Sequence, residues 1–213
     1  MIDIIIDQKK YEVAEGRNLL AVCLENGIYI PNLCFLDDEE SPEASCRMCF
    51  VEIEGTPSPV PACTICTTSG LKARTDTPAV RRLQRSALRL LLSTHDVDCK
   101  HCHANRACEL QKIARFLQVG LKSKPLAQIE RSVQVDTGHP WIDHYPHRCV
   151  LCGKCIRTCS SRHELPVFSF VGRGIDTVVR HYRISGVKAL DCPACHRCVD
   201  ICPVGALKLR VAG

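Results

Sequence analysis

The sequence predicts an α+β protein built from three small modules rather than one large domain. The 213 residues include 17 cysteines, whereas aromatic residues make up only 5% of the chain. With so few large apolar side chains, metal sites have to replace part of the burial that would otherwise stabilise each module. The cysteines fall into spaced groups, separated by short strand and helix patterns. We therefore place modules at residues 1–77, 78–119 and 140–213, with a linker at 120–139.

The number of cysteines also raises the question of disulfides, which need an oxidising compartment. The chain begins Met1-Ile-Asp-Ile-Ile-Ile-Asp, which lacks the basic start and long apolar core of a secretory signal. No apolar run reaches membrane-spanning length. We therefore expect a cytoplasmic protein with reduced, metal-binding cysteines and no membrane insertion.

The first module starts with two strand patterns and one helix pattern. Residues 2–6 form a β-branched run, and residues 11–13 resume an alternating pattern after a polar turn, which predicts a β-hairpin. Asn18 can then cap a helix that ends at Asn26-Gly27. Strand, strand, helix and then a cysteine loop is the order expected of a β-grasp ferredoxin.

That loop supplies four cysteines, separated by eleven, two and thirteen residues: Cys34, Cys46, Cys49 and Cys63. Four thiolates with one close pair are compatible with a [2Fe–2S] cluster or with structural zinc. Cys66 lies three residues after Cys63 and could compete for the fourth position. Cys23 sits among apolar helix residues, where a buried thiol packs as a small hydrophobe.

The second module pairs a helix with a histidine and three cysteines. Thr77-Pro78 is a favoured helix start, and the apolar spacing that follows predicts about four turns ending near Ser93. The next residues follow the pattern H-x3-C-x2-C-x5-C, namely His95, Cys99, Cys102 and Cys108. Three cysteines leave a [4Fe–4S] cubane one ligand short, and an imidazole nitrogen is the natural substitute. His101 and His103 are expected to face solvent.

The third module contains the run C-x2-C-x2-C-x3-C twice: Cys149, Cys152, Cys155 and Cys159, then Cys192, Cys195, Cys198 and Cys202. In such a run three thiolates cap one cubane, while the fourth points to a second cluster. We therefore expect crossed ligation. Cys202 would complete the cluster of Cys149, Cys152 and Cys155, and Cys159 would complete the other. Residues 167–171 and 176–180 between the runs predict short strands around a glycine turn.

The formal net charge of +5 does not indicate a nucleic-acid partner. That count treats every cysteine as neutral, whereas cluster-bound thiolates are charged. One [2Fe–2S] and three [4Fe–4S] clusters would add roughly −7, which leaves about −2. We also find no G-x-G-x-x-G after a strand and no P-loop, so we do not expect this chain to bind NAD or flavin by itself.

Two of these patterns resemble known families. The segments Gly27-Ile-Tyr-Ile-Pro-Asn-Leu-Cys34, Cys46-Arg-Met-Cys49 and Pro61-Ala-Cys63 resemble the [2Fe–2S] domain that opens [FeFe]-hydrogenases and the iron–sulfur subunit of respiratory complex I. The pattern at His95 resembles the His(Cys)3 [4Fe–4S] module of the same families. The resemblance implies [2Fe–2S] rather than zinc, Cys63 rather than Cys66 as ligand, and His95 as an iron ligand.

The resemblance covers only the electron-relay portion of those families, which continue into catalytic or molybdopterin-enzyme-like domains. This sequence ends at Gly213. It is therefore similar to the free-standing small iron–sulfur (diaphorase) subunit of NAD-linked or electron-bifurcating [NiFe] hydrogenases. The resemblance implies an electron-transfer subunit that is inactive alone. It would lie between an FMN- and NAD(H)-binding subunit and a catalytic subunit, for which the free-standing members of the family favour a [NiFe] hydrogenase.

Other functions stay open at this point. The chain could serve an NAD-linked formate dehydrogenase or another complex I-like NADH oxidoreductase. It could be a free multi-cluster ferredoxin, although four clusters are more than a shuttle needs. A zinc-stabilised interaction protein would be colourless, which distinguishes it from all of these.

Overall fold

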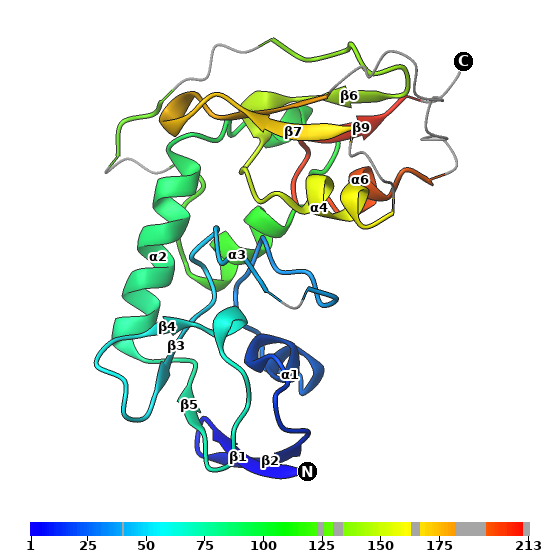
Figure 1. The fold of residues 1–213 in the computed structure, drawn as a ribbon. Coiled ribbons are helices and arrows are strands. Elements are labelled where there is room, and N and C mark those ends of the chain that lie inside the picture. Colours follow the sequence, from blue (N-terminus) through cyan, green and yellow to red (C-terminus); the bar gives the residue numbers. More distant parts are fainter. Residues whose placement is uncertain (40, 123–125, 130–133, 163–166, 182–194, 211–213) are drawn as a thin grey trace. The chain divides into compact units, whose positions relative to one another are not determined.

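The computed structural model describes all residues except 40, 123–125, 130–133, 163–166, 182–194 and 211–213. The chain forms two compact units. One contains Met1–Leu90 and Ile113–Val119, and the other contains Leu91–Lys112 and Gly120–Gly213. Strands and helices occur in both units, as the predicted α+β class requires (Figure 1).

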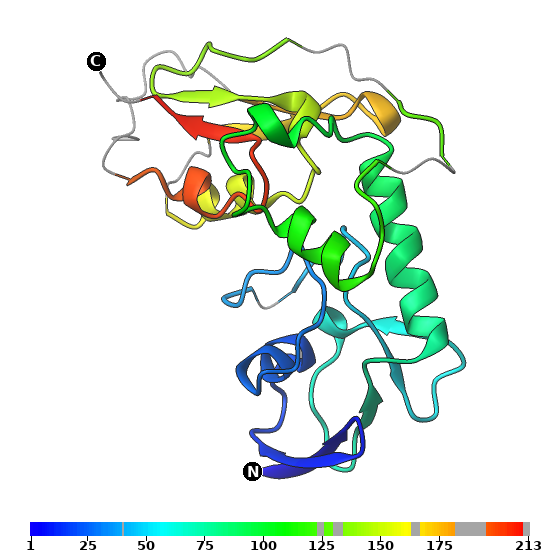
Figure 2. The same cartoon turned by 180° about the vertical axis from the view of Figure 1, so that it is seen from behind.

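The first unit is built on a mixed five-stranded sheet. Its strands in spatial order are β2 (Lys9–Val13), β1 (Ile2–Ile6), β5 (Lys72–Arg74), β3 (Phe50–Ile53) and β4 (Val60–Pro61). The hairpin of β1 and β2 is antiparallel, with Ile2 opposite Val13. β5 runs parallel to β1 and antiparallel to β3. The hairpin and its place at the start of the chain confirm the prediction (Figures 1 and 2).

Helix α1 (Leu19–Glu25) starts where the capping pattern predicts. The Asn18 side chain accepts hydrogen bonds from the backbone N–H groups of Leu20 and Ala21, which have no partner inside the helix. The same side chain donates to the carbonyl of Cys63 at 2.6 Å. Asn18 therefore fixes the helix start and the position of Cys63 together. The helix buries its apolar face, including the fully buried Cys23.

Helix α2 (Pro78–Leu92) is capped by Thr77, whose hydroxyl accepts from the N–H of Val80 at 3.2 Å. Helix α3 (Glu109–Phe116) brings the Phe116 ring edge-on to Tyr29, with centroids 4.7 Å apart. The guanidinium of Arg81 also contacts this ring, 4.2 Å from its centre. These contacts attach the end of α3 to the first unit.

The second unit contains two antiparallel strand pairs and short helices. β6 (Ile142–His144) pairs with β9 (Leu207–Leu209), and β7 (Phe168–Val171) pairs with β8 (Val178–His181). Helices α4 (Lys154–Ser160) and α6 (Arg197–Asp200) lie beside each other below the strands in Figure 1. A small apolar core of Ile142, Phe168, Val179 and Leu207 holds strands and helices together.

The part of the chain that the structure describes also contains four single-turn 3₁₀ helices: η1 (Ala62–Thr64), η2 (Cys99–His101), η3 (Pro146–Arg148) and η4 (Gly174–Asp176). Three of them contain or adjoin a cysteine of the predicted metal sites. In the described part of residues 120–139, the N–H of Ile129 donates to the carbonyl of Ser93 at 2.7 Å. Among the described residues, no helix is both long enough and apolar enough to cross a membrane.

Candidate metal centres

Four cysteines of the first unit lie together in its core: Cys34, Cys46, Cys49 and Cys63, none more than 7% exposed. They form two pairs, because the thiol of Cys46 hydrogen bonds with Cys34 and the thiol of Cys49 with Cys63. The backbone N–H of Cys46 also donates to the sulfur of Cys34 at 3.5 Å. By contrast, Cys66 is exposed, so the structure separates it from this group.

The loop around these cysteines curls because two residues adopt left-handed backbone angles. Ala44 has φ of 50° and Arg47 has φ of 51°, on either side of Cys46. Such alternation turns successive N–H groups toward one concave side, where they can donate to sulfur. The cost of a left-handed non-glycine residue is tolerated mainly at functional sites.

Two thiol pairs match the donor set of a binuclear cluster, in which each iron takes two thiolates. Without metal, the hydrogen bond to Cys34 and burial together raise the pKa of Cys46 well above its usual range. The hydrogen bond from Cys49 lowers the pKa of Cys63, which therefore ionises first. A bound cation would have to displace the remaining protons, so binding is coupled to their release.

The second group consists of His95, Cys99, Cys102 and Cys108. His95 is 9% exposed, and its Nδ1 atom has no hydrogen-bond partner among the described residues. Burial lowers the pKa of His95 to about 4, although a hydrogen bond to the Arg148 backbone acts in the opposite direction. The ring is therefore neutral at pH 7, with a buried nitrogen available, as a metal-binding imidazole requires.

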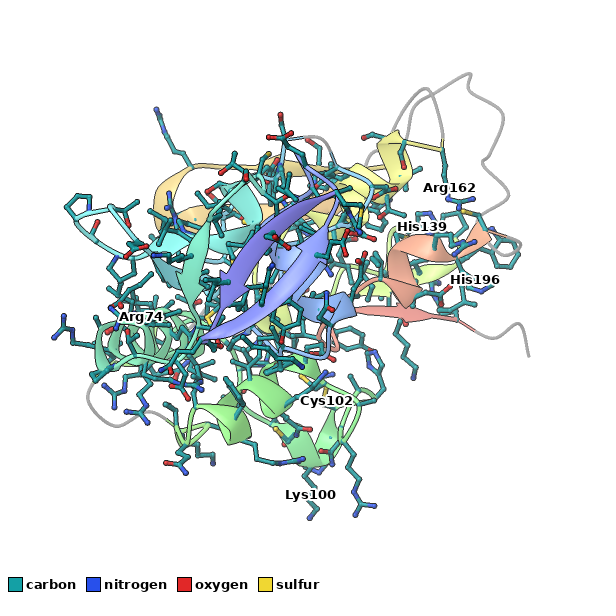
Figure 3. The ribbon with its side chains drawn as sticks, turned by 90° about the horizontal axis from the view of Figure 1, so that it is seen from below. Arg74, Lys100, Cys102, His139, Arg162 and His196 are labelled. Atoms are coloured by element: carbon teal, nitrogen blue, oxygen red, sulfur yellow. The ribbon has the colours of Figure 1, made fainter. Side chains whose placement is uncertain are left out.

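The three cysteines of this group lie close to one another. Burial raises the pKa of Cys108, and charges on Cys102 and Cys99 add to this effect. The two other histidines of the loop already have partners. His101 is exposed and pairs with Asp98 at 2.7 Å, and His103 is hydrogen bonded to the Leu207 carbonyl at 3.1 Å. Figure 3 shows Lys100 of the same loop extending outward and Cys102 lying within it.

The third group surrounds a small, mainly apolar cavity in the second unit. Cysteines from both repeated runs line it, together with a histidine and small apolar residues: Cys149, Cys152, Cys155, Cys202, His144, Val150, Gly153, Val179, Val204, Ala206 and Leu207. Leu151 and Gly153 have φ of 53° and 71°, and this local curl brings the first three sulfurs to one side. Cys202 comes from the chain after α6.

Four thiols, one imidazole and apolar side chains line the cavity, and four thiols are the donor set of a [4Fe–4S] cluster. Burial raises the pKa of Cys152 to about 11 and raises that of Cys155 well above its usual range. The backbone N–H of Leu151 donates to the sulfur of Cys149 at 3.4 Å, which stabilises a thiolate there. These cysteines would ionise only with a cation beside them, and a [4Fe–4S] core supplies that charge.

The fourth group is described only in part. Burial raises the pKa of Cys159, and the nearby Cys195 adds to this effect, so cysteines of the two runs meet here as well. Cys198 is buried on α6, which lies against α4. Cys192, the remaining predicted ligand, lies outside the described residues.

Comparison with known proteins agrees with this geometry. Residues 1–78 match the family model of the 2Fe-2S iron-sulfur cluster binding domain. Residues 84–121 match the NADH-ubiquinone oxidoreductase-G iron-sulfur binding region, and residues 139–208 match the ferredoxin-like domain of NADH-quinone oxidoreductase subunit 3. The chain is made of iron–sulfur domains. These matches confirm the predicted fold class and the presence of [2Fe–2S] and [4Fe–4S] binding domains.

Among curated proteins, the chain is 35% identical over 208 residues to the NADH-quinone oxidoreductase G 2 subunit of Rhizobium meliloti (strain 1021), covering 97% of this chain and 24% of that protein. It is 33% identical over 211 residues to the HndD subunit of the NADP-reducing hydrogenase of Solidesulfovibrio fructosivorans. This match covers 97% of this chain and 36% of that subunit. The chain thus spans about a quarter to a third of these relatives.

A solved structure also matches, the crystal structure of an NAD+-reducing [NiFe]-hydrogenase in the H2-reduced state. The TM-score is 0.87 at 27% identity, and the match covers 100% of this chain and 88% of that one. The iron–sulfur domains therefore resemble those of both the G-type NADH-quinone oxidoreductase subunits and the NAD-reducing [NiFe] hydrogenase, as the sequence motifs indicated.

Within the second unit, the candidate metal-binding groups are neighbours. Burial raises the pKa of Cys202, and a charge on Cys102 of the His95 group adds to it. Burial likewise raises the pKa of Cys155, with a contribution from Cys198 of the fourth group. The cavity group is therefore near both of the other groups. Sequence motifs identified its cysteines but not His144, because a lone histidine in a short strand has no ligand spacing.

Proposed function

We propose that this chain carries single electrons through one [2Fe–2S] and three [4Fe–4S] clusters. The observation that carries the proposal is the adjacency of three cysteine groups in the second unit, where Cys102 lies near Cys202 and Cys155 lies near Cys198. A row of closely spaced one-electron centres is what an electron relay requires. Clusters suit this task because protein burial and hydrogen bonding set the potential of each one.

The proposed ligands follow the four groups. Cys34, Cys46, Cys49 and Cys63 would hold the [2Fe–2S] cluster, and His95 with Cys99, Cys102 and Cys108 the first [4Fe–4S] cluster. Cys149, Cys152, Cys155 and Cys202 would hold the second, and Cys159, Cys192, Cys195 and Cys198 the third. The described residues of these groups fit the assignment in burial and donor chemistry.

The chain's own residues prepare these sites for electron transfer. Apolar side chains such as Val150, Val179 and Leu207 keep water from the cavity group. Backbone N–H groups of Leu151 and Val167 donate to the sulfurs of Cys149 and Cys159, each at 3.4 Å. Such donors disperse negative charge on the thiolates and so favour the reduced state.

We further propose that electrons enter from an FMN- and NAD(H)-binding subunit and leave to a [NiFe] hydrogenase subunit, in the cytoplasm. Support comes from the solved NAD+-reducing [NiFe]-hydrogenase, in which the matching chain is similar over 88% of its length. The NADP-reducing hydrogenase of Solidesulfovibrio fructosivorans contains a similar region. In this proposal the chain has no catalytic site of its own.

A second candidate is the relay portion of a complex I-like NADH oxidoreductase or of an NAD-linked formate dehydrogenase. The match to the NADH-quinone oxidoreductase G 2 subunit of Rhizobium meliloti, over 97% of this chain, favours the first of these. A freely diffusing ferredoxin would place the same clusters in a chain with no fixed partner.

Purification of the native complex under anaerobic conditions tests these alternatives. We expect co-purification with a flavin subunit, about fourteen iron atoms in this chain, nickel in the complex, and hydrogen oxidation coupled to NAD. Formate oxidation by a complex without nickel would contradict the hydrogenase assignment and support the formate dehydrogenase. Elution of the native chain near its own 23.7 kDa would favour the diffusing carrier. Reduction of dyes by NADH with this polypeptide alone, or zinc in place of iron, would overturn the relay.

A further inference from the structure

His144 is a buried histidine in the wall of the cavity formed by Cys149, Cys152, Cys155 and Cys202. Its backbone position is fixed from two sides. In β6, His144 stands opposite Leu207 of β9, and on the other side it exchanges two backbone hydrogen bonds with Asp136, at 2.8 and 2.9 Å. Because the side chain is also only 3% exposed, it is packed inside the unit beside the cavity that the residue lines.

The ring is buried but unpartnered. His144 is 3% exposed, and neither Nδ1 nor Nε2 has a hydrogen-bond partner among the described residues. A neutral imidazole carries one N–H donor and one acceptor nitrogen. Burying both without partners costs free energy that a valine or leucine at the same place would avoid. A buried polar group of this kind needs an explanation.

The nearest carboxylate does not supply a partner, because it is engaged elsewhere. Asp136 binds Arg180 at 3.3 Å, His181 at 3.5 Å and the N–H of Gly138 at 3.0 Å. His144 lines the same cavity as Cys149, Cys152, Cys155 and Cys202, so sulfur is the acceptor that the described residues offer there. A cluster held there would add further sulfur acceptors.

Resting on the proposed cluster assignment, we infer that His144 donates an N–H hydrogen bond to a sulfur of the [4Fe–4S] cluster held by Cys149, Cys152, Cys155 and Cys202, and thereby raises its reduction potential. Reduction adds an electron, and the negative charge spreads onto the sulfurs. An N–H directed at one of them stabilises the reduced state more than the oxidised state. His144 thus sets the potential of the cluster in the middle of the proposed relay.

Redox titration of the anaerobic full-length holoprotein tests this inference. The cluster's EPR signal is first assigned as the one altered by Cys152→Ser. In His144→Phe, which keeps an aromatic ring without a donor, we expect a lower midpoint potential. At the wild-type midpoint the ratio of oxidised to reduced cluster should rise about tenfold, equivalent to about 59 mV for a one-electron couple. In His144→Gln, which keeps an N–H donor, the midpoint potential should fall by less than in His144→Phe.

His139 provides the matched control, because it is similarly buried at 6% exposure but is not among the residues lining the cavity. Its Nδ1 already accepts the N–H of Trp141 at 3.1 Å. His139 is labelled in Figure 3. His139→Phe should leave the midpoint of the assigned cluster unchanged. An equal shift in both variants would mean a general effect of buried histidines and would overturn the inference.

A second measurement does not require a His144 variant. In wild-type protein with ¹⁵N-labelled histidine, ENDOR of the reduced cluster should show a coupled, exchangeable N–H proton and one weakly coupled nitrogen. Iron content shows whether the cluster is present, independently of what His144 does. A loaded cluster with an unchanged midpoint in His144→Phe, or without the nitrogen coupling in wild type, overturns the role of His144 only. Wild-type protein without any signal sensitive to Cys152→Ser overturns the proposed cluster as well.

Discussion

The backbone of Gly205 lies directly against the sulfur of Cys102. A Cβ atom built on Gly205 would overlap Cys102 Sγ and would also come within 3.3 Å of the Ala104 Cβ. The N–H of Glu109 donates to the carbonyl of Pro203 at 2.9 Å and holds the same two segments together. Glycine at this position therefore lets the chain after Cys202 approach the loop of Cys102.

We predict that Gly205→Ala destabilises the holoprotein by about 1 to 3 kcal/mol, the usual cost of overpacking. The sulfur cannot move aside if it binds iron, so the His95 group should also lose cluster content. Thermal unfolding and iron analysis under anaerobic conditions measure both effects. Gly120→Ala is the control, because no atom of the described residues, its two chain neighbours aside, lies within 4 Å of the Cβ position there. Equal melting temperatures for the two variants would contradict the prediction.

We predict that His95→Ala weakens one [4Fe–4S] cluster, so that air exposure lowers iron from about fourteen to about ten atoms. The reason is that the buried Nδ1 of His95 has no hydrogen-bond partner within the described part of the chain. His95→Cys should retain the cluster at a lower potential, since a thiolate adds negative charge. His101→Ala should have little effect, because His101 is exposed and pairs with Asp98. An unchanged EPR spectrum in His95→Ala would move the ligand role to another residue.

We predict that Cys63→Ser removes the [2Fe–2S] cluster and about two iron atoms. Cys63 is 1% exposed and hydrogen bonded with Cys49, and Asn18 holds its carbonyl. Cys66→Ser should retain the cluster, since Cys66 is exposed. Visible circular dichroism and EPR of the reduced proteins distinguish the two variants. Loss of the cluster in Cys66→Ser alone would reverse this assignment.

The fourth prediction concerns acid stability and His139. Burial lowers the pKa of His139 to about 4, and the charges of His181 and Arg210 lower it further while Asp136 acts against them. The unfolded chain therefore binds a proton at His139 near pH 6.5 that the folded chain binds only near pH 4. Neutral His139 thus contributes about 3 kcal/mol to the free energy of unfolding. This contribution is fully present above about pH 6.5 and is lost as the pH falls from about 6.5 to about 4.

Wild type should consequently lose more stability between about pH 7.5 and about pH 5 than His139→Gln, which does not titrate. Anaerobic denaturant unfolding of both proteins at the two pH values gives the difference, and acid effects on the clusters are common to both. His101→Gln is the control, because His101 is exposed and the same substitution there replaces a histidine that is not buried. Parallel pH profiles for wild type and His139→Gln would show that His139 is protonated equally in both states.

The sequence by itself determined the metal chemistry and the local elements. Ligand spacing reports how a short loop turns, so the C-x2-C motifs, the Asn18 cap and the helix after Thr77 were readable from neighbouring residues. The repeated cysteine run also predicted a contact between residues that are distant in sequence. One run leaves its fourth cysteine pointing away, so the duplication predicted that Cys202 would approach Cys149, and the structure places both around one cavity.

Only the tertiary structure decided which polar groups surround those sulfurs. His144 reaches the cavity because β6 pairs with β9, far along the chain. Gly205 meets Cys102 for a similar reason, through the packing of two segments that are distant in sequence. Such approaches depend on strand register and on the packing of distant segments, which no local spacing encodes. The candidate ligands could therefore be proposed from the sequence, whereas the groups packed around them could not.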